Sequence, residues 1–490
     1  MKALLLNPPF LPKFSRPQRS PAVTKSGTLY YPIWLAYATG VLEQDWVAAT
    51  LLDAPARGFS LTDTVSYAAS MKPDLVVMDT STPSIQNDML VAMKLRDAIP
   101  DCFIVMVGTH VSALAEETLL TCDAIDAVAR REYEYTIRDL SRVLRQNRVD
   151  RNRNDGLQGI GGLSYRMNGH VVHNPDRVYI AHLDNLPWVS TVYQKHLNIR
   201  DYFNPNALYP MVTLITSRGC PFRCSFCLYP QTLTGRRYRF RSIADVLDEI
   251  EFVVRTFPDA QSIFFEDDTL TANKQRCLQF ADGIVQRGIR IPWTANSRIE
   301  VDLETMIRIR AAGCRQLCVG FESGSQQVLD SMKKGIQIER MQRFMRDARQ
   351  AGILIHGCFM VGFPGETAES VQQTIDLAIR LKPDTVQFYP VMVYPGTEAY
   401  DSYLRKGWIT SRDYRDWVTT EGLHNCVVRN EFLTSRDLVR LCDLARRRFY
   451  LRPGYILYKL RQMLERPSEV IRTVKAARTF CRHLLVGSRV

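Results

Sequence analysis

The chain has 490 residues and a net charge of +12, with 46% hydrophobic and 23% charged residues. This length predicts two or three domains, each able to bury its own core, and the composition excludes an intrinsically disordered chain. No uninterrupted apolar stretch reaches spanning length, so we expect no transmembrane helix.

The N-terminal sequence MKALLLNPPF carries one lysine and a short apolar run that prolines interrupt. This pattern is not that of a signal peptide, so we expect a cytoplasmic protein whose thiols stay reduced. The twelve cysteines of such a chain predict metal ligation, catalysis or core positions rather than disulfides. Of these, we expect Cys314, Cys318 and Cys358 to pack in the core.

Residues 1–146 alternate apolar segments with helical patterns at 33–43, 60–70 and 87–98. Continuously apolar strands are typical of a parallel sheet that is covered on both faces. We therefore predict an α/β domain with a Rossmann-like, doubly wound sheet, whose ligand lies at the carboxyl ends of the strands. The strand candidates are residues 2–9, 48–55, 74–82, 102–111 and 124–132.

Residues 147–209 begin with a polar stretch and contain Asn168-Gly169, a dipeptide typical of a hairpin turn. We expect this segment to be a linker that carries one hairpin.

Residues 210–410 contain a second βα series, which predicts a partial (β/α)6 barrel of TIM type. In barrels the loops that follow the strands carry the chemistry. Residues 411–490 are predicted to form a basic helical region. The barrel strand candidates are residues 211–217, 262–269, 292–298, 316–323, 353–364 and 385–395.

A cysteine motif follows the first barrel strand: Cys220, Cys224 and Cys227 are spaced C-x3-C-x2-C. Three thiolates on one tight loop can hold three irons of a [4Fe–4S] cluster and leave the fourth iron free. Zinc usually takes four closed ligands, and no nearby Cys or His completes such a set. We expect Arg218 and Arg223 to offset the charge of the cluster. The alternative is three cysteines packed in the core.

This motif, placed after the first strand of a βα barrel, resembles that of radical S-adenosylmethionine (SAM) enzymes. In that family the free iron binds SAM, and an electron from the cluster releases a 5′-deoxyadenosyl radical. The resemblance implies SAM contacts at the ends of the strands. The implied cofactor-binding residues are Phe226, Glu266, Asp267, Asp268, Ser297, Arg298, Glu322, Ser323 and Gly362.

The N-terminal domain resembles that of the cobalamin-dependent branch of the family, in its segments YYPIWLAYATGVLEQ, VGTHVSA and VARREYEYT. The resemblance implies a cobalamin cofactor. However, Thr109 and Arg131 stand where the branch has glycines, which allow a backbone to approach a large ligand closely. The alternative is a degenerate domain that is kept as a scaffold.

Segments such as CLYPQTLTGRRYRFRS and GFESGSQQVLDSMKKG resemble the hopanoid-biosynthesis-associated radical SAM family, which acts on bacteriohopanetetrol head groups to form a cyclitol ether. This resemblance implies rearrangement of a lipid-linked or polyol substrate by ring contraction, with an external electron donor of flavodoxin or ferredoxin type. The alternatives are C-methylation with methylcobalamin and, in another class, a non-catalytic metal-binding or nucleic-acid-binding protein.

The last fifty residues hold twelve Lys/Arg and three Asp/Glu, a surplus of nine positive charges. Aromatic and aliphatic residues recur among them at roughly helical spacing, which suits a helix lying on an anionic membrane surface. A basic helical cap on the barrel is the alternative. We expect no nucleic-acid partner, because no recognition motif is present.

Overall fold

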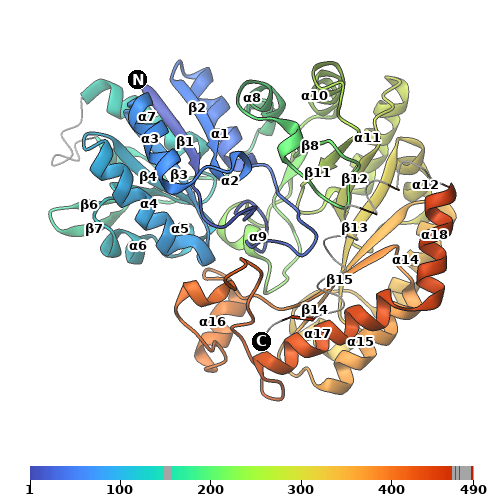
Figure 1. Ribbon diagram of the computed structural model, residues 1–490. Coiled ribbons are helices and arrows are strands. Elements are labelled where there is room, and N and C mark those ends of the chain that lie inside the picture. The colour runs from blue at the N-terminus through green and yellow to red at the C-terminus, as the bar shows by residue number, and fades with distance from the viewer. Residues whose placement is uncertain (148–155, 466–469, 471–473, 475–486, 489–490) are drawn as a thin grey trace.

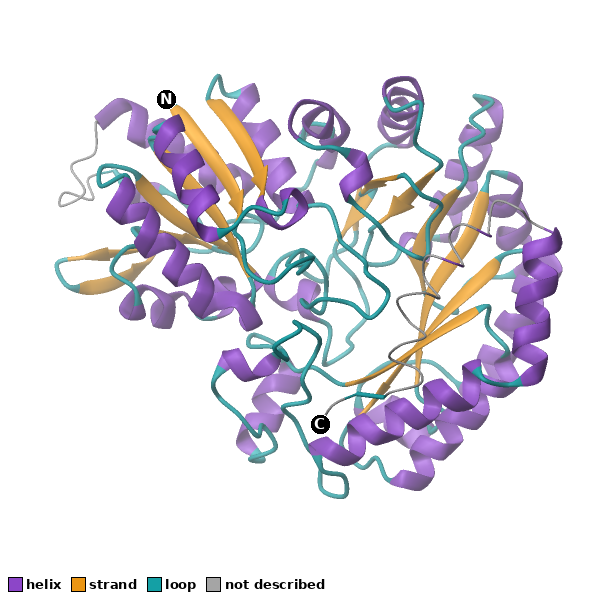
Figure 2. Cartoon of the chain, viewed as in Figure 1, coloured by secondary structure: helices purple, strands orange, loops and turns teal. Residues whose placement is uncertain are grey.

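The computed structural model describes residues 1–147, 156–465, 470, 474 and 487–488. Within these residues the chain forms two α/β units that lie side by side (Figure 1). The N-terminal unit and the barrel each have helices outside the sheet, and loops fill the space between the two sheets (Figure 2). These loops bring together segments that are far apart in the sequence.

The N-terminal sheet has the strand order β2-β1-β3-β4-β5-β6-β7, in which the first five strands are parallel. The predicted doubly wound, Rossmann-like sheet is thereby confirmed. The strands are β1 (Lys2–Asn7), β2 (Ala48–Asp53), β3 (Leu75–Thr80), β4 (Phe103–Gly108) and β5 (Ala127–Ala129). The helices are α1 (Ile33–Gln44), α2 (Ala54–Arg57), α3 (Leu61–Met71), α4 (Ile85–Ala98), α5 (Thr109–Ala113), α6 (Ala115–Thr121) and α7 (Glu134–Asn147).

The predicted hairpin consists of β6 (Leu163–Met167) and β7 (His170–His173), with positive φ angles of 51° and 80° at Asn168 and Gly169. It differs from the prediction in its position, because β6 pairs antiparallel with β5 and extends the N-terminal sheet. Strand β5 has only three residues and would otherwise leave an open edge, which β6 covers. The hairpin is therefore part of the sheet rather than of a free linker.

The second unit is a six-stranded sheet of order β15-β14-β13-β12-β11-β8, with every pair parallel. Since β8 and β15 are its two edges, the predicted partial barrel is confirmed. The strands are β8 (Met211–Leu214), β11 (Ser262–Phe265), β12 (Trp293–Ser297), β13 (Cys314–Glu322), β14 (Leu354–Val361) and β15 (Thr385–Pro390). The connecting helices are α10 (Ile243–Thr256), α11 (Lys274–Gln286), α12 (Leu303–Ala311), α13 (Gln326–Ser331), α14 (Ile338–Ala351) and α15 (Ala368–Leu381).

One continuous cluster of buried apolar side chains runs through both units. It includes Leu5 and Val105 of the N-terminal sheet and Phe264 of the barrel. Tyr193 joins them from α8 (Val189–His196), which packs against α1. The two units therefore share a hydrophobic core, which holds their facing edges in place.

The C-terminal region is only partly helical. Residues 411–434 are irregular apart from a short 3-10 turn at Tyr414–Trp417, and helices follow as α17 (Ser435–Tyr450) and α18 (Pro453–Glu465). Most of the predicted helical tail after residue 465 lies outside the described residues. No helix in the described part of the chain has the length and apolarity required to cross a membrane.

Candidate active site

The cysteine loop begins directly after a two-residue strand, β9 (Ser217–Arg218), and ends at the short helix α9 (Leu228–Thr232). Gly219 makes the turn between the strand and the loop, with φ +84°, and a Cβ atom there would lie 2.2 Å from the Arg237 carbonyl oxygen. The Cys220 amide donates to the Gly235 carbonyl oxygen at 3.2 Å. Only glycine fits this turn, and it directs Cys220 into the loop.

All three cysteines are free thiols, and Cys220 and Cys227 are partly exposed. Burial, with a smaller effect from Asp268, raises the pKa of Cys220 to about 11, and burial raises the pKa of Cys227 well above its usual value. Thiols in such surroundings become thiolates only when a cation or metal compensates the charge. No group of three His, Cys, Asp or Glu in the described residues converges on a single ion. A [4Fe–4S] cluster instead gives each cysteine its own iron.

Arg298, which directly follows β12, is the cation at the cysteine loop. Its guanidinium donates to the Cys224 sulfur at 3.7 Å and lies 3.7 Å from the centroid of the Phe222 ring. Glu300 and the Lys334 carbonyl oxygen hold the guanidinium at 3.1 and 2.8 Å. Arg298 is thus placed to stabilise a thiolate.

The expected role of Arg218 is wrong. Its guanidinium points away from the cysteine loop and is buried between the units, 2.7 Å from the Glu134 carboxylate and 3.4 Å from that of Glu132. Arg239 binds Glu132 from the other side at 2.8 Å. The acidic residues of the segment REYEYT therefore hold the N-terminal unit against the barrel. Arg223, in contrast, is exposed.

The three acidic residues after β11 have different surroundings. Asp267 accepts hydrogen bonds from the Thr216 amide and hydroxyl at 2.7 Å and from the Ser217 hydroxyl at 2.5 Å, so it braces the strand that leads into the cysteine loop. Asp268 instead lies near Cys220 and Cys227, where its charge adds to the rise in their pKa values, and Glu266 lies beside Asn296 of β12. Burial raises the pKa of Glu266 to about 7.

Arg19, a residue that no sequence motif indicates, forms ion pairs with Glu266 and Asp268. Its guanidinium pairs with the Glu266 carboxylate, donates to Asp268 at 3.3 Å and lies 5.2 Å from the centroid of the Tyr229 ring. Arg19 comes from the loop after β1, so the N-terminal unit contributes a side chain to the cysteine site. No local signal reveals it, because its partner is 247 positions away.

The residues after β13 form a second charged group. Glu322 has φ +67° and pairs with Lys334 at 2.8 Å, and both side chains are buried. The Glu322 Oε2 atom is buried without a hydrogen-bond partner. An orphaned buried acceptor of this kind fits a ligand donor. Ser323 instead anchors its loop to Thr374 of α15 at 3.2 Å.

Two further predicted cofactor-binding residues, Phe226 and Gly362, meet through Phe363. Phe226 packs edge-on against Phe363, with ring centroids 5.4 Å apart, and Phe363 directly follows Gly362. Gly362 has φ +116°, and its carbonyl oxygen accepts from the Tyr403 hydroxyl at 2.7 Å. Ser297 is turned toward Thr271, with 2.8 Å between the hydroxyl oxygens. Of the three cysteines expected in the core, Cys314 is buried there, Cys318 is partly exposed but packs against the core, and Cys358 is partly exposed.

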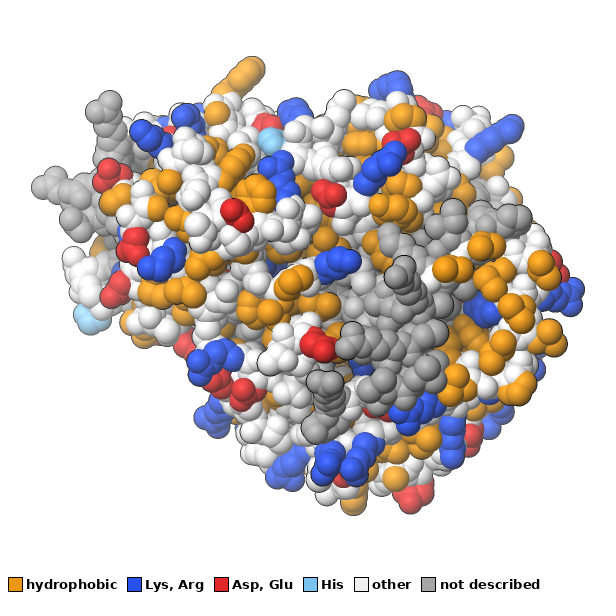
Figure 3. Space-filling view, viewed as in Figure 1, with side chains coloured by type: hydrophobic (Ala, Val, Ile, Leu, Met, Phe, Trp, Pro, Cys, Tyr) orange, Lys and Arg blue, Asp and Glu red, His pale blue; other side chains and the backbone are white. Residues whose placement is uncertain are grey.

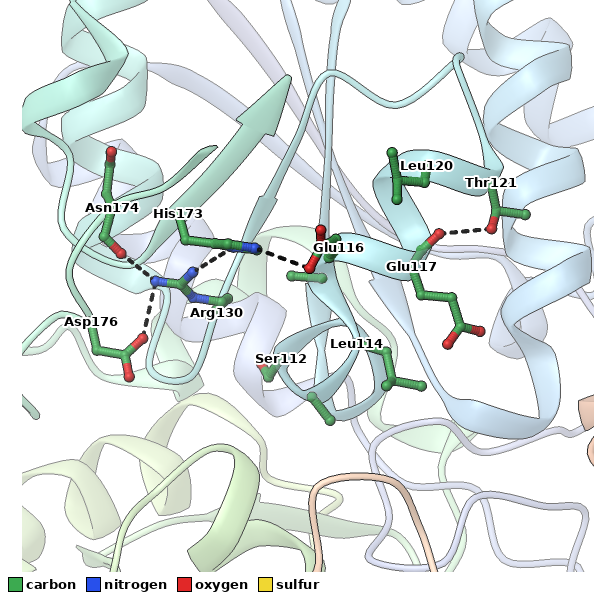
Figure 4. A pocket seen from close by; sticks show the side chains of 12 residues that line it. Ser112, Leu114, Glu116, Glu117, Leu120, Thr121, Arg130, His173, Asn174 and Asp176 are labelled. Atoms are coloured by element: carbon green, nitrogen blue, oxygen red, sulfur yellow. Dashed lines mark hydrogen bonds and ion pairs between the residues drawn. The ribbon is translucent and has the colours of Figure 1, made fainter. Parts of the chain in front are cut away.

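A cavity of about 910 Å³ lies at the carboxyl edge of the N-terminal sheet, beside the loops after β4 and β5. Figure 4 shows Arg130 between Asp176 and His173, with Glu116 of α6 beyond the imidazole. The Arg130 guanidinium lies 3.0 Å from the Asp176 carboxylate and 3.2 Å from the His173 ring. Polar side chains line this side of the cavity, and α5 and α6 line the other side. The cavity is open to solvent.

The two expected glycine positions, Thr109 and Arg131, lie close in sequence to Ser112 and Arg130, which line this cavity. Arg131 adopts φ +61°, a conformation that favours glycine, and its side chain bonds the Tyr179 hydroxyl at 2.9 Å. Gly108, just before Thr109, has φ +112°, and a Cβ atom there would lie 2.6 Å from the Thr80 carbonyl oxygen. The backbone at Arg131 therefore keeps the shape that a glycine would give, whereas Thr109 begins α5 and has no positive φ.

Comparisons with known proteins agree with this arrangement. The model of the radical SAM superfamily matches residues 214–378, and that of the B12 binding domain matches residues 19–141. A protein of Pyrococcus horikoshii named as an uncharacterized methyltransferase is 31% identical over 458 residues, which cover 93% of this chain and 94% of that protein. The anaerobic magnesium-protoporphyrin IX monomethyl ester cyclase of Rubrivivax gelatinosus is 25% identical, over 91% of this chain and 78% of the cyclase.

Among solved structures, the radical SAM methyltransferase TsrM of Kitasatospora setae, with cobalamin and a [4Fe–4S] cluster bound, has the same fold. It superposes with a TM-score of 0.69 and 18% identity, over 92% of this chain and 89% of TsrM. A hopanoid relative is also found, the hopanoid C-3 methylase of Methylococcus capsulatus, which is 23% identical over 70% of this chain and 63% of the methylase.

The fold and the cysteine site thus define a radical SAM enzyme that carries a B12-binding domain. The chain belongs to the radical SAM superfamily, in the branch with this N-terminal domain. That branch uses a [4Fe–4S] cluster, SAM and cobalamin. The three free thiols, the orphaned Glu322 oxygen and the cavity at the edge of the N-terminal sheet fit these groups.

Proposed function

We propose that the chain is a cobalamin-dependent methyltransferase that acts on a carbon atom of a small-molecule or lipid substrate. The observation that carries this proposal is the approach of the two carboxyl edges at the cysteine loop. Arg19 crosses from the B12-binding unit to Glu266, and α5 reaches the barrel at Gly396, where an added Cβ atom would lie 2.8 Å from the Ala113 Cβ atom. The two units therefore contact each other at the carboxyl edges where both cofactors are proposed to bind.

When bound, the cluster supplies the electron that cleaves SAM, and cobalamin supplies the methyl group. The chain's own residues position the reactants. Cys220, Cys224 and Cys227 hold the cluster, and Arg298 stabilises its thiolates. Glu266 and Asp268, with Arg19 between them, bind the charged amino acid end of SAM.

Further residues complete the SAM site in this proposal. Phe226 and Phe363, which pack edge-on against each other, together offer an aromatic surface to the adenine. Glu322 offers its unpaired oxygen to a hydroxyl group of the ribose. Asp267, Ser297 and Ser323 serve as braces that fix the strand ends, since their polar atoms are already engaged.

The comparisons favour methyl transfer over the ring contraction expected from the sequence. The Pyrococcus relative, at 31% identity, is named as a methyltransferase, and the hopanoid relative is also a methylase, whereas the less similar relative at 25% identity is a cyclase. A hopanoid head group as the substrate rests on the sequence resemblance alone.

We also propose a cytoplasmic enzyme that receives electrons from a flavodoxin-type or ferredoxin-type donor. Arg223 and Arg237 are exposed beside the cysteine loop and offer positive charge to such an acidic protein. Part of this proposal is a peripheral contact of the basic C-terminal region with a membrane.

The test is anaerobic reconstitution with iron, sulfide and cobalamin, followed by reaction with SAM and a strong reductant. We expect iron–sulfur and corrinoid absorption bands, and 5′-deoxyadenosine as a product. The triple variant C220A/C224A/C227A should lose the cluster and the cleavage of SAM, whereas C318A should keep both. Candidate substrates should gain one methyl group with release of S-adenosylhomocysteine. An isomeric product without S-adenosylhomocysteine would contradict methyl transfer.

A further inference from the structure

Helix α18 buries polar side chains and exposes apolar ones. Lys459 and Gln462 are 9% and 6% exposed, and the Lys459 ammonium donates to the Gln462 side chain at 2.7 Å. In contrast, Leu457 and Leu464 are 69% and 83% exposed. A surface helix that faces water has the opposite distribution. The outward face of α18 is therefore suited to an apolar environment.

The exposed residues form one stripe, because Leu457, Leu460 and Leu464 recur at the spacing of a single helix face, with Ile456 beside them. Of the nineteen large hydrophobic side chains that are exposed in the described residues, nine lie between Leu444 and Val474. Figure 3 shows hydrophobic side chains gathered at the right of the view, where Figure 1 places α18. A contiguous exposed patch of this kind marks an interaction surface.

The inner face of α18 is fixed to the barrel, so the leucines cannot rotate inward. The Tyr455 hydroxyl donates to the Asp384 carbonyl oxygen at 3.0 Å, and the Tyr458 hydroxyl donates to the Asp384 side chain. Tyr455 also packs against Phe449 and Tyr450 of α17, with ring centroids 5.2 and 5.1 Å apart. The apolar stripe is thus a fixed feature of the surface.

From this arrangement we infer that the outward face of α18 docks on an anionic lipid bilayer. The charge of the region selects this partner. Residues 441–490 carry a surplus of nine positive charges, which attracts an anionic surface and repels a second copy of the same region. Arg461 is exposed on α18, as are Arg447 and Arg448 on α17, and leucines with such exposed cations form the composition of a helix that lies in a membrane interface.

Co-flotation with vesicles tests this inference without turnover, so its outcome does not depend on the proposed methyl transfer. The full-length protein should float with vesicles that contain phosphatidylglycerol, and less with neutral phosphatidylcholine vesicles. The variant L457E/L460E/L464E should lose at least tenfold in apparent vesicle affinity, because glutamates on this face cannot enter the interface.

The matched control is V254E/V285E/I307E, which changes the net charge by the same amount. Its residues are 46%, 57% and 48% exposed on the outer helices of the barrel. It should float like the unaltered protein, and both variants should keep the thermal midpoint of unfolding. The inference is overturned if the unaltered protein does not float, or if the two variants lose binding equally. It is also overturned if gel filtration shows a dimer that only the α18 variant disrupts.

Discussion

Arg19 is the residue through which the B12-binding unit reaches the proposed SAM site. It is one cation placed against two carboxylates, those of Glu266 and Asp268. Above about pH 7, where Glu266 loses its proton, the two carboxylates carry one more charge than Arg19, which suits the ammonium group of SAM. An arginine is also able to bind a carboxylate with two parallel hydrogen bonds.

The substitution Arg19→Ala should weaken SAM binding by about tenfold, which corresponds to about 1.4 kcal/mol. Arg19→Lys should restore part of this loss. The measurement is the dissociation constant of SAM, followed through the change that SAM causes in the electron paramagnetic resonance signal of the reduced cluster.

The control for Arg19 is Lys13→Ala, which removes the same charge from an exposed position of the same loop. It should leave SAM binding unchanged. Equal SAM affinity in the Arg19→Ala and Lys13→Ala variants would show that Arg19 has no role in the SAM site.

The stability of the protein should depend on pH because of Asp79, near the end of β3. Burial raises the pKa of its carboxyl group from 3.8 to about 7. Between pH 4 and 7 the unfolded chain loses this proton while the folded chain keeps it, so folding loses roughly 2–4 kcal/mol as the pH rises. Asp79→Asn should remove this contribution. Thermal melts at pH 5 and pH 8 should show the unaltered protein losing more stability than the variant over this interval.

At the scale of single elements, the turn at Gly219 sets the direction of the cysteine loop. Gly219→Ala places a Cβ atom 2.2 Å from a backbone oxygen in a left-handed conformation. The loop must then shift, and we expect less than about half of the normal iron content after reconstitution, with a stability loss of roughly 1–3 kcal/mol.

Gly288 provides the matched control for Gly219. It has φ +66°, and no atom lies within 4 Å of an added Cβ. Gly288→Ala therefore costs only about 1 kcal/mol of backbone strain and should leave the iron content unchanged. If both alanine variants load iron equally, the turn does not control the cluster site.

The elements that carry local signals could be predicted from the sequence. The parallel strands follow from continuous apolar segments, and the cysteine loop from its spacing. Residues that act through distant partners could not. Arg19 and Arg218 each pair with carboxylates on the other unit. The position of Asp267 at a strand end likewise does not show whether its side chain faces a ligand or a neighbouring strand. The hairpin was predicted, but not its pairing partner, because edge pairing depends on the length of β5.

At the scale of the whole molecule, a buried ion cluster joins the two units. Arg218 is 1% exposed between Glu132 and Glu134 and lies 4.5 Å from the centroid of the Tyr37 ring. Arg218→Met leaves two buried carboxylates with less compensation, which should cost about 3–5 kcal/mol of unfolding free energy.

Denaturant unfolding measures this loss, and two further variants serve as controls for it. Arg142→Met removes an arginine from a more exposed pair with Asp45 and should cost at most about 1 kcal/mol. Arg218→Met combined with Glu134→Gln removes one opposite-charge pair, leaves Glu132 paired with Arg239, and should recover part of the loss. A single Arg218→Met variant as stable as Arg142→Met would refute the role of the cluster.

The core that both units share also has a consequence for synthesis. Helix α1 is completed at residue 44, whereas α8, which packs against it, ends at residue 196. At ribosomal speeds of about 5–20 residues per second, the face of α1 that packs against α8 stays uncovered for roughly ten seconds or more before α8 is synthesised. The nascent chain is therefore a natural client for holding chaperones, and slow translation of this stretch should increase its aggregation in the cell.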